Sequence, residues 1–173
     1  MSGRTTSNPF KLLSLIAILL CLAMAPFSVS AAADPPDKPP VFANDQAAMN
    51  YYLVLADQLD VTTGISKSVF YSGAGNRKMA EQFAIAEDKM TLEMTPGGKF
   101  LDDLKLFEQG SPLKPEQATK VWSRLSRRYA EQASGDVFCF VAGARPTGVF
   151  TTVELPELRK NRKVGSIYHV SRL

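Results

Sequence analysis

Residues 115–141 read PEQATKVWSRLSRRYAEQASGDVFCFV and predict a long helix followed by a buried strand. Pro115 fits the first position of a helix, where an N–H would be unpaired in any case. Apolar side chains then recur at spacings of three and four residues, as in an amphipathic helix: Ala118, Val121, Trp122, Leu125, Tyr129 and Ala133. The apolar run Val137–Val141 has the length and composition of a buried strand. A helix of this kind before a buried strand favours an α/β or α+β domain.

Further elements are expected on both sides of this stretch. Asn44 is a candidate N-cap for a helix that ends near Leu59. Thr95-Pro96 predicts the start of a second helix, which runs to about Phe107. The Gly97-Gly98 pair disfavours this second helix. The remaining segments are a strand at 68–71, a helix at 76–86, an extended segment at 89–93, and strand-like runs at 149–154 and 164–170.

These elements together predict an α/β (α+β) fold. We expect a small, mostly parallel four-stranded sheet that is flanked by helices and preceded by a short helical segment. The strands at 137–141 and 164–170 are apolar, with β-branched or aromatic residues, and are expected to be buried. Cys139 on the first of them is interpreted as a small buried hydrophobic residue.

The N-terminus has the pattern of a secretory signal peptide at residues 1–33. Arg4 and Lys11 flank an apolar run of about 14 residues, and small residues follow, so cleavage after Ala31 or Ala33 fits equally well. The run is short for a membrane-spanning helix, which needs about 20 apolar residues. We therefore expect secretion, with a signal anchor as the alternative. Residues 34–43 predict a flexible leader before a single domain at 44–173.

Composition limits the chemistry that this chain can carry. It has 173 residues, 45% of them hydrophobic, and two cysteines, so neither a disulfide scaffold nor a cysteine-based zinc cluster is expected. His169 is the single histidine, which excludes a multi-histidine metal site. The formal charge is +3, of which Arg4 and Lys11 contribute two, so residues 34–173 carry +1 and give no reason to expect nucleic-acid binding. One dense basic run is interpreted as a solvated loop rather than a polyanion site: Arg159, Lys160, Arg162 and Lys163.

Candidate functional residues lie near the ends of predicted strands and on the long helix. In chain order they are Tyr71, Ser72, Glu93, Trp122, Ser126 and Glu154. Glu154 ends a predicted strand, which is where α/β sheets usually bind ligands. Trp122 taken alone is more typical of a core residue than of a ligand platform. Each signal is weak by itself, and the order along the chain is the informative feature.

That order resembles the ADP-ribosyl cyclase / NAD glycohydrolase family, known from mammalian cell-surface enzymes and a mollusc cyclase. Four blocks carry the resemblance: Val69-Phe70-Tyr71-Ser72; Met90–Gly97 with Leu101–Leu104; Val121–Ala130; and Phe150–Glu154. The third block is the most specific, because Trp-x-x-x-Ser-Arg-Arg-aromatic-Ala is not a generic helix pattern.

The resemblance implies a role for each matching residue. Glu154 matches the catalytic glutamate, Trp122 the tryptophan that holds the nicotinamide end, and Glu93 the acid associated with hydrolysis over cyclisation. Tyr71 falls where the family usually has a second tryptophan. The other implied substrate-binding positions are Ser72, Leu92, Ser126 and Phe150. Arg127 and Arg128 are equally consistent with binding the diphosphate and with facing solvent.

The sequence also departs from the family pattern. The family's several disulfides are absent, and the helical region before the first strand is much shorter. Gly73 stands where a basic residue is common, so that one phosphate contact is missing or is supplied elsewhere. Met94 replaces a second acid after Glu93.

The function that the resemblance implies is a secreted NAD glycohydrolase, acting on NAD or NADP as substrate, with minor cyclic ADP-ribose formation. Because nicotinamide is cationic in NAD and leaves as a neutral molecule, a single carboxylate suffices and no metal or bound cofactor is implied. An arginine-modifying ADP-ribosyltransferase is disfavoured because Thr152 stands where its second acid is needed. The alternative is a secreted binding or effector protein on the same fold with weakened catalysis.

Overall fold

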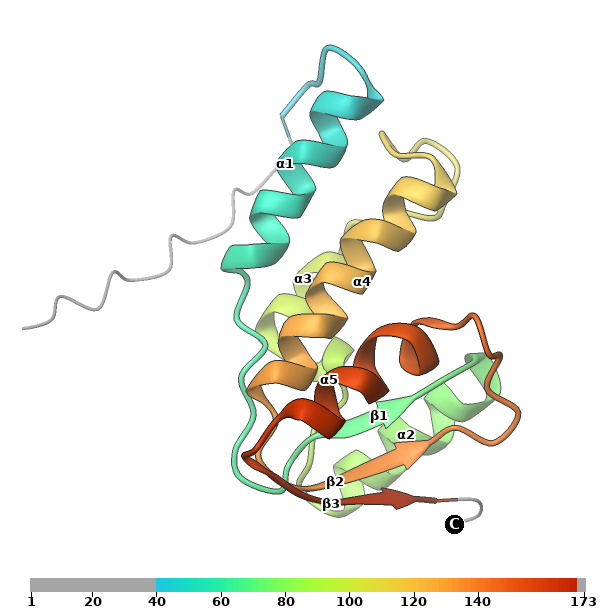
Figure 1. The fold of residues 1–173 in the computed structure, drawn as a ribbon. Coiled ribbons are helices and arrows are strands. Elements are labelled where there is room, and N and C mark those ends of the chain that lie inside the picture. The colour runs from blue at the N-terminus through green and yellow to red at the C-terminus, as the bar shows by residue number, and fades with distance from the viewer. Residues whose placement is uncertain (1–39, 171–173) are drawn as a thin grey trace, which may run out of the picture. The chain divides into compact units, whose positions relative to one another are not determined.

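The computed structural model describes residues 40–170, and the predicted signal peptide lies outside the described residues. Five α-helices, two short helical turns and three strands follow one another (Figure 1). The bounds are α1 Asp45–Gln58, β1 Val69–Tyr71, α2 Ala74–Ala86, η2 Leu92–Met94, α3 Pro96–Asp103, α4 Pro115–Gln132, β2 Gly135–Phe140, η3 Phe150–Glu154, α5 Leu155–Lys160 and β3 Val164–His169. Among these residues no helix combines the length and the apolar character needed to span a membrane.

The sheet is entirely parallel, with strand order β1-β2-β3. Phe70 pairs with Cys139 and Val137 pairs with Ile167, so β2 is the central strand. The mixed α/β class is confirmed, but the sheet has three strands in the described residues where four were predicted. Because all strands run the same way, the carboxyl ends of β1 and β2 meet at one edge.

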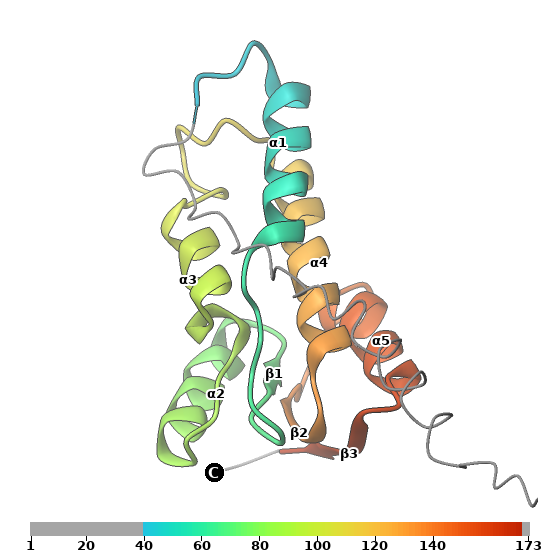
Figure 2. The same cartoon turned by 90° about the vertical axis from the view of Figure 1, so that its left-hand side faces the viewer.

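Helices cover both faces of the sheet, and the long helices extend the core away from it. Figure 2 shows α2 on one side of the strands and α5 on the other, while α1 and α4 lie side by side above them. Val69 and Phe140 pack with Ala80 and Ala84 of α2. Phe70 and Cys139 belong to the larger cluster, which continues through α1 and α4. The prediction that Cys139 is a small buried hydrophobic residue is confirmed, since its side chain is fully buried.

The predicted helix starts at Asn44, Thr95 and Pro115 are confirmed. Asn44 Oδ1 accepts from the N–H of Ala47, and Thr95 Oγ1 accepts from the N–H of Gly98. The Gly97-Gly98 pair is compatible with α3 because both glycines lie against backbone. A Cβ on Gly98 would stand 1.8 Å from the carbonyl oxygen of Leu92, and one on Gly97 would stand 2.6 Å from that of Asp60.

Three local predictions are wrong. The strand predicted at 149–154 is instead a π-helical turn, η3 (Phe150–Glu154), although Thr151, Thr152 and Val153 favour strands. The Leu155 N–H bonds to the Phe150 carbonyl, and η3 continues directly into α5. The strand at 164–170 lies at the sheet edge and is largely exposed. The segment at 89–93 has one bridge residue, Met90, and then turns into η2.

Candidate active site

A cavity of about 340 Å³ lies at the carboxyl ends of β1 and β2. Its walls come from six segments: the end of β1, η2, the turn after α3, α4, the loop after β2, and η3. The lining residues include Tyr71, Ser72, Gly73, Leu92, Glu93, Phe107, Thr119, Trp122, Ser126, Tyr129, Gly143, Arg145, Gly148, Val149, Phe150 and Glu154. Its size and position are those of a small-molecule site in a parallel α/β sheet.

Glu154 is a buried carboxyl group in the wall of this cavity. It closes the π-helical turn, so that Phe150 and Glu154 both point inward from one short segment. The pKa of Glu154 is raised to about 8, mainly by burial and also by the charge of nearby Glu93, while the Ser126 hydroxyl acts in the opposite direction. A buried carboxyl with a raised pKa in a cavity is typical of a catalytic group.

The long helix α4 contributes one stripe of side chains to the cavity. Thr119, Trp122, Ser126 and Tyr129 are spaced by three and four residues and therefore share one helix face. Trp122 is half-buried, which agrees better with a ligand platform than with a core position. Tyr129 is fully buried, and its hydroxyl accepts from the N–H of Val69 at 3.1 Å, so the helix is fixed to β1 beneath the cavity.

Tyr71 and Glu93 form a direct hydrogen bond across the cavity wall. The Tyr71 hydroxyl donates to Oε1 of Glu93 at 2.5 Å, while Oε2 of Glu93 is buried without a partner in the described residues. Burial raises the pKa of Glu93, and the Tyr71 hydrogen bond acts against that shift. Burial, followed by the charge of Glu93, raises the pKa of Tyr71, so this hydroxyl stays protonated at neutral pH.

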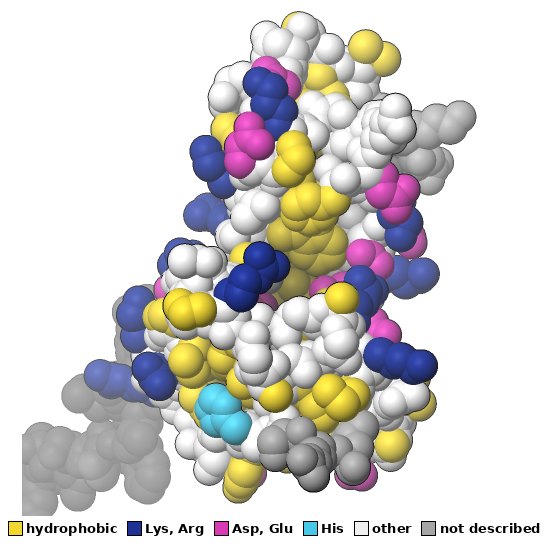
Figure 3. Space-filling view, turned by 90° about the vertical axis from the view of Figure 1, so that its right-hand side faces the viewer, with side chains coloured by type: hydrophobic (Ala, Val, Ile, Leu, Met, Phe, Trp, Pro, Cys, Tyr) yellow, Lys and Arg dark blue, Asp and Glu magenta, His cyan; other side chains and the backbone are white. Residues whose placement is uncertain are grey.

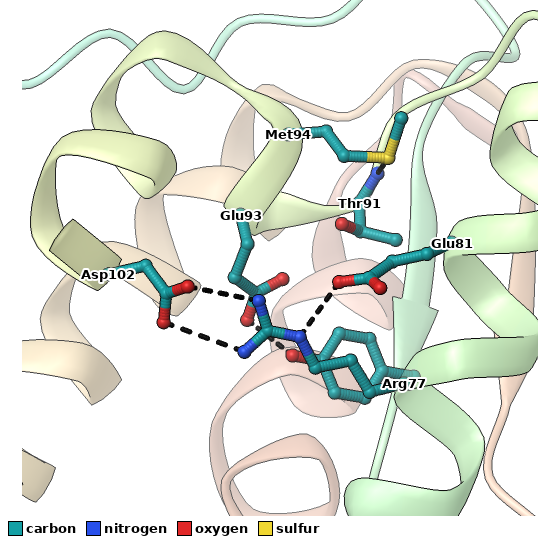
Figure 4. A network of polar contacts seen from close by, with 7 residues as sticks. Arg77, Glu81, Thr91, Glu93, Met94 and Asp102 are labelled. Atoms are coloured by element: carbon teal, nitrogen blue, oxygen red, sulfur yellow. Dashed lines mark hydrogen bonds and ion pairs between the residues drawn. The ribbon is translucent and has the colours of Figure 1, made fainter.

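Arg77 lies close to Glu93, between the carboxyl groups of Asp102 and Glu81 (Figure 4). Arg77 of α2 donates from Nη2 to Oδ2 of Asp102 at 3.0 Å and from Nε to Oε1 of Glu81 at 2.8 Å. The hydrogen bond to Asp102 is the main reason why the pKa of Arg77 is raised. The two acids hold the guanidinium, which joins α2 to α3. A second cavity of about 520 Å³ begins here and shares Glu93, Phe107 and Trp122 with the first.

The loop between β2 and η3 and the turn after β1 form the remaining rim of the cavity. Gly73 has φ +90° and Gly143 has φ +72°, conformations that favour glycine, and no atom lies within 4 Å of a Cβ built on either. The exposed Arg145 belongs to this rim. Figure 3 shows a hollow with hydrophobic side chains inside and Lys or Arg side chains at its edge.

All eight residues that the sequence singled out line this one cavity: Tyr71, Ser72, Leu92, Glu93, Trp122, Ser126, Phe150 and Glu154. The two arginines after Ser126 do not. Arg127 pairs with Glu157 at 2.6 Å, and Arg128 donates to the carbonyl oxygens of Ala56 and Leu59 at the end of α1. Arg127 is exposed, as the solvent-facing alternative predicted, whereas Arg128 is partly buried and joins α4 to the end of α1, so neither predicted role fits it.

Sequence reasoning missed Phe107, Thr119 and Arg145. Thr119 was within reach, because it lies three residues before Trp122 on the same helix face. Phe107 was assigned to a helix stripe, whereas it is exposed in the turn after α3 and lines both cavities. Arg145 carries no periodic signal. Among residues 40–170 no group of three or more His, Cys, Asp or Glu side chains is placed to hold a metal ion.

No family model and no curated protein sequence matches this chain significantly. Solved structures do match. Porcine CD38 with a covalent intermediate is 22% identical over 73% of this chain and 70% of its own, with a TM-score of 0.53. Aplysia cyclase with the substrate NGD and the product cGDPR is 22% identical over 75% and 65%, with a TM-score of 0.50. An ADP-ribosyl cyclase complexed with N1-cIDPR is 21% identical over 76% and 58%, with a TM-score of 0.51.

These alignments cover 58–70% of the lengths of the three neighbours. The sequence identities are low, so the likeness establishes the fold and not the activity. The described part of the chain therefore has the fold of CD38 and the ADP-ribosyl cyclases.

Proposed function

We propose that this protein is a secreted NAD glycohydrolase. It cleaves the bond between nicotinamide and ribose in NAD or NADP, giving nicotinamide and ADP-ribose or its phosphorylated counterpart, with a cyclic product as a minor outcome. The observation that carries the proposal is the buried Glu154 carboxyl in a cavity that also holds Trp122, Tyr71 and Glu93. Secretion rests on the N-terminal sequence pattern alone.

Cleavage of the nicotinamide–ribose bond needs one negative charge beside the ribose and a binding site for the cationic nicotinamide ring. Nicotinamide departs as a neutral molecule, so the developing positive charge lies on the ribose, where the Glu154 carboxylate stabilises it. The aromatic faces of Trp122 and Tyr71 attract the cationic ring, with about 0.5–2 kcal/mol for each contact. Bound substrate brings a positive charge beside Glu154, which favours the ionised form that the reaction requires.

Glu93 supports hydrolysis as the main outcome. Its side chain is fixed by the Tyr71 hydroxyl, and its second carboxyl oxygen is buried without a protein partner. A buried, unpaired oxygen is costly, so this atom is poised to accept a hydrogen bond from substrate or water. After nicotinamide leaves, attack by water gives ADP-ribose, and attack by the adenine ring gives the cyclic product.

The test is incubation of the purified protein with NAD and separation of the products by chromatography. Glu154→Gln keeps the size of the side chain and removes its charge, and we expect its turnover to fall by at least about a thousandfold. Glu157→Gln is the matched control, because Glu157 is on the next turn, pairs with Arg127 and does not line the cavity.

Release of nicotinamide by the parent and by Glu157→Gln, but not by Glu154→Gln, supports the proposal. A parent protein that binds NAD and releases no nicotinamide above the Glu154→Gln background contradicts it. That result leaves the alternative, a binding protein on the same fold.

A further inference from the structure

Arg145 is the one Lys or Arg residue that lines the main cavity within the described part of the chain. Two acids, Glu93 and Glu154, line the same cavity. Arg77, the other arginine nearby, lines the second cavity and is held by Asp102 and Glu81. Among residues 40–170, Arg145 therefore provides the only formal positive charge on the wall of the main cavity.

The guanidinium of Arg145 has no acidic partner or hydrogen-bond acceptor among residues 40–170. Four other arginines are engaged by contrast: Arg77 with Asp102, Arg124 with Asp57, Arg127 with Glu157, and Arg128 with the carbonyl oxygens of α1. An exposed arginine beside a cavity, with all its donors available, is suited to an anionic ligand group.

The backbone of Arg145 is nevertheless fixed relative to Glu154. Its carbonyl oxygen accepts from the N–H of Gly148 and from the Thr151 hydroxyl, each at 3.0 Å. Thr151 is part of the η3 turn that ends at Glu154. The loop that carries the positive charge is thereby tied to the turn that carries the catalytic carboxyl.

The neighbours of Arg145 on this rim are small and polar. The Ser72 hydroxyl stands 3.6 Å from the position of a Cβ on Gly148, which brings the end of β1 close to the Arg145 loop. Gly73 and Gly143 leave open space in front of their backbone. A rim made of glycine backbone, one hydroxyl and one guanidinium matches the recognition chemistry of a phosphate group.

We propose that Arg145 binds the diphosphate of the dinucleotide substrate. The inference rests on the proposed function and adds the residue that selects a phosphate-bearing substrate. NAD carries a cationic nicotinamide ring and an anionic diphosphate. The cavity offers Glu93 and Glu154 to the cationic ring and Arg145 to the diphosphate. Arg145 is a substrate-binding residue and takes no part in bond cleavage.

The experiment measures equilibrium binding of NAD to the full chain carrying Glu154→Gln, so that bound NAD is not consumed. Calorimetry gives the affinity, and the fluorescence of Trp122, the only tryptophan, gives an independent reading. In this background Arg145→Gln is expected to weaken NAD binding about tenfold, and Arg145→Lys less, because lysine keeps the charge and loses the planar fork. Arg159→Gln is the matched control, since Arg159 is exposed and lies outside the cavity lining.

Salt dependence separates an electrostatic contact from a structural one. Raising the ionic strength is expected to weaken NAD binding in the background protein and in Arg159→Gln, and to weaken it much less in Arg145→Gln. If NAD binds and Arg145→Gln has unchanged affinity or an unchanged salt dependence, the inference is overturned while the proposed function stands. If neither the background protein nor the parent binds NAD, the proposed function and this inference are overturned together.

Discussion

Glu154 and Glu93 are two carboxyl groups in one cavity whose environments differ in a way that suits different tasks. Both have raised pKa values because of burial, and the charge of Glu93 contributes to the raised pKa of Glu154. Glu93 is tied to Tyr71 by a hydrogen bond and faces the second cavity as well. Glu154 lies beside Ser126 and belongs to the main cavity alone. This difference is the basis for proposing Glu154 as the catalytic group and Glu93 as an acceptor for a hydrogen bond from substrate or water.

The raised pKa of Glu154 predicts the pH dependence of the reaction. The carboxylate is the active form, so kcat/KM for NAD is expected to rise with pH and to level off above an inflection near the free-protein pKa of about 8. Bound substrate is cationic and lowers that pKa, so the inflection in kcat is expected at lower pH. Initial rates between about pH 5 and 9.5, at low and at saturating NAD, measure both profiles.

Glu157→Gln provides the control for this pH profile, since it removes an acid outside the cavity and is expected to keep both inflections. A kcat/KM that is constant over the whole range would contradict the assignment of Glu154 as the group that must ionise.

At the scale of elements, the sequence predicted best where a regular pattern coincides with burial. The stripe on α4 and the N-caps were predictable because each depends on neighbours within one or two turns. The strand predicted at 149–154 failed because Thr-Thr-Val favours strands locally, while packing of η3 and α5 against α4 decides the outcome. Arg145 and Phe107 were not predictable as site residues, because long-range packing and not periodicity brings their turns to the cavity.

The contact between α3 and η2 carries a prediction about stability. In Gly98→Ala the new Cβ would meet the Leu92 carbonyl oxygen at 1.8 Å, so α3 or η2 has to move. We expect the free energy of unfolding to fall by about 3 kcal/mol or more. Because η2 carries Glu93, NAD turnover by the folded fraction should fall as well. Urea unfolding followed by circular dichroism measures the stability change.

Gly75→Ala is the matched comparison for Gly98→Ala. Gly75 also lies in the first turn of a helix, but no atom is within 4 Å of its built Cβ and its backbone does not require glycine. We expect this variant to be unchanged or more stable by about 0.5 kcal/mol. Equal destabilisation of the two variants would show that the close contact between α3 and Leu92 is not what requires Gly98.

At the scale of the whole molecule, the site exists only when separate parts of the described chain pack together. The end of β1 and the η3 turn belong to the sheet region, whereas α4 extends into the helical region above it (Figure 1), and η2 packs against α3. Tyr129 joins the two regions through its hydrogen bond to Val69. Any substitution that separates α4 from β1 is therefore expected to affect Trp122, Ser126 and catalysis together.

The packed core alone has to hold this arrangement, because the chain has two cysteines and only Cys139 lies in the described residues, fully buried and free. Burial raises the pKa of the Cys139 thiol to about 12, so the reactive thiolate is absent at neutral pH.

In the full chain carrying Cys21→Ala, we expect the same Tm with and without a reducing agent. Labelling of Cys139 by a thiol reagent should be at least about a thousandfold slower than in denaturant, since it requires unfolding. Ser166→Cys in the same background places a thiol on the exposed edge strand and should react at once. If Cys139 reacts as fast as that exposed thiol, β2 opens readily and the core does not hold the cavity as this structure requires.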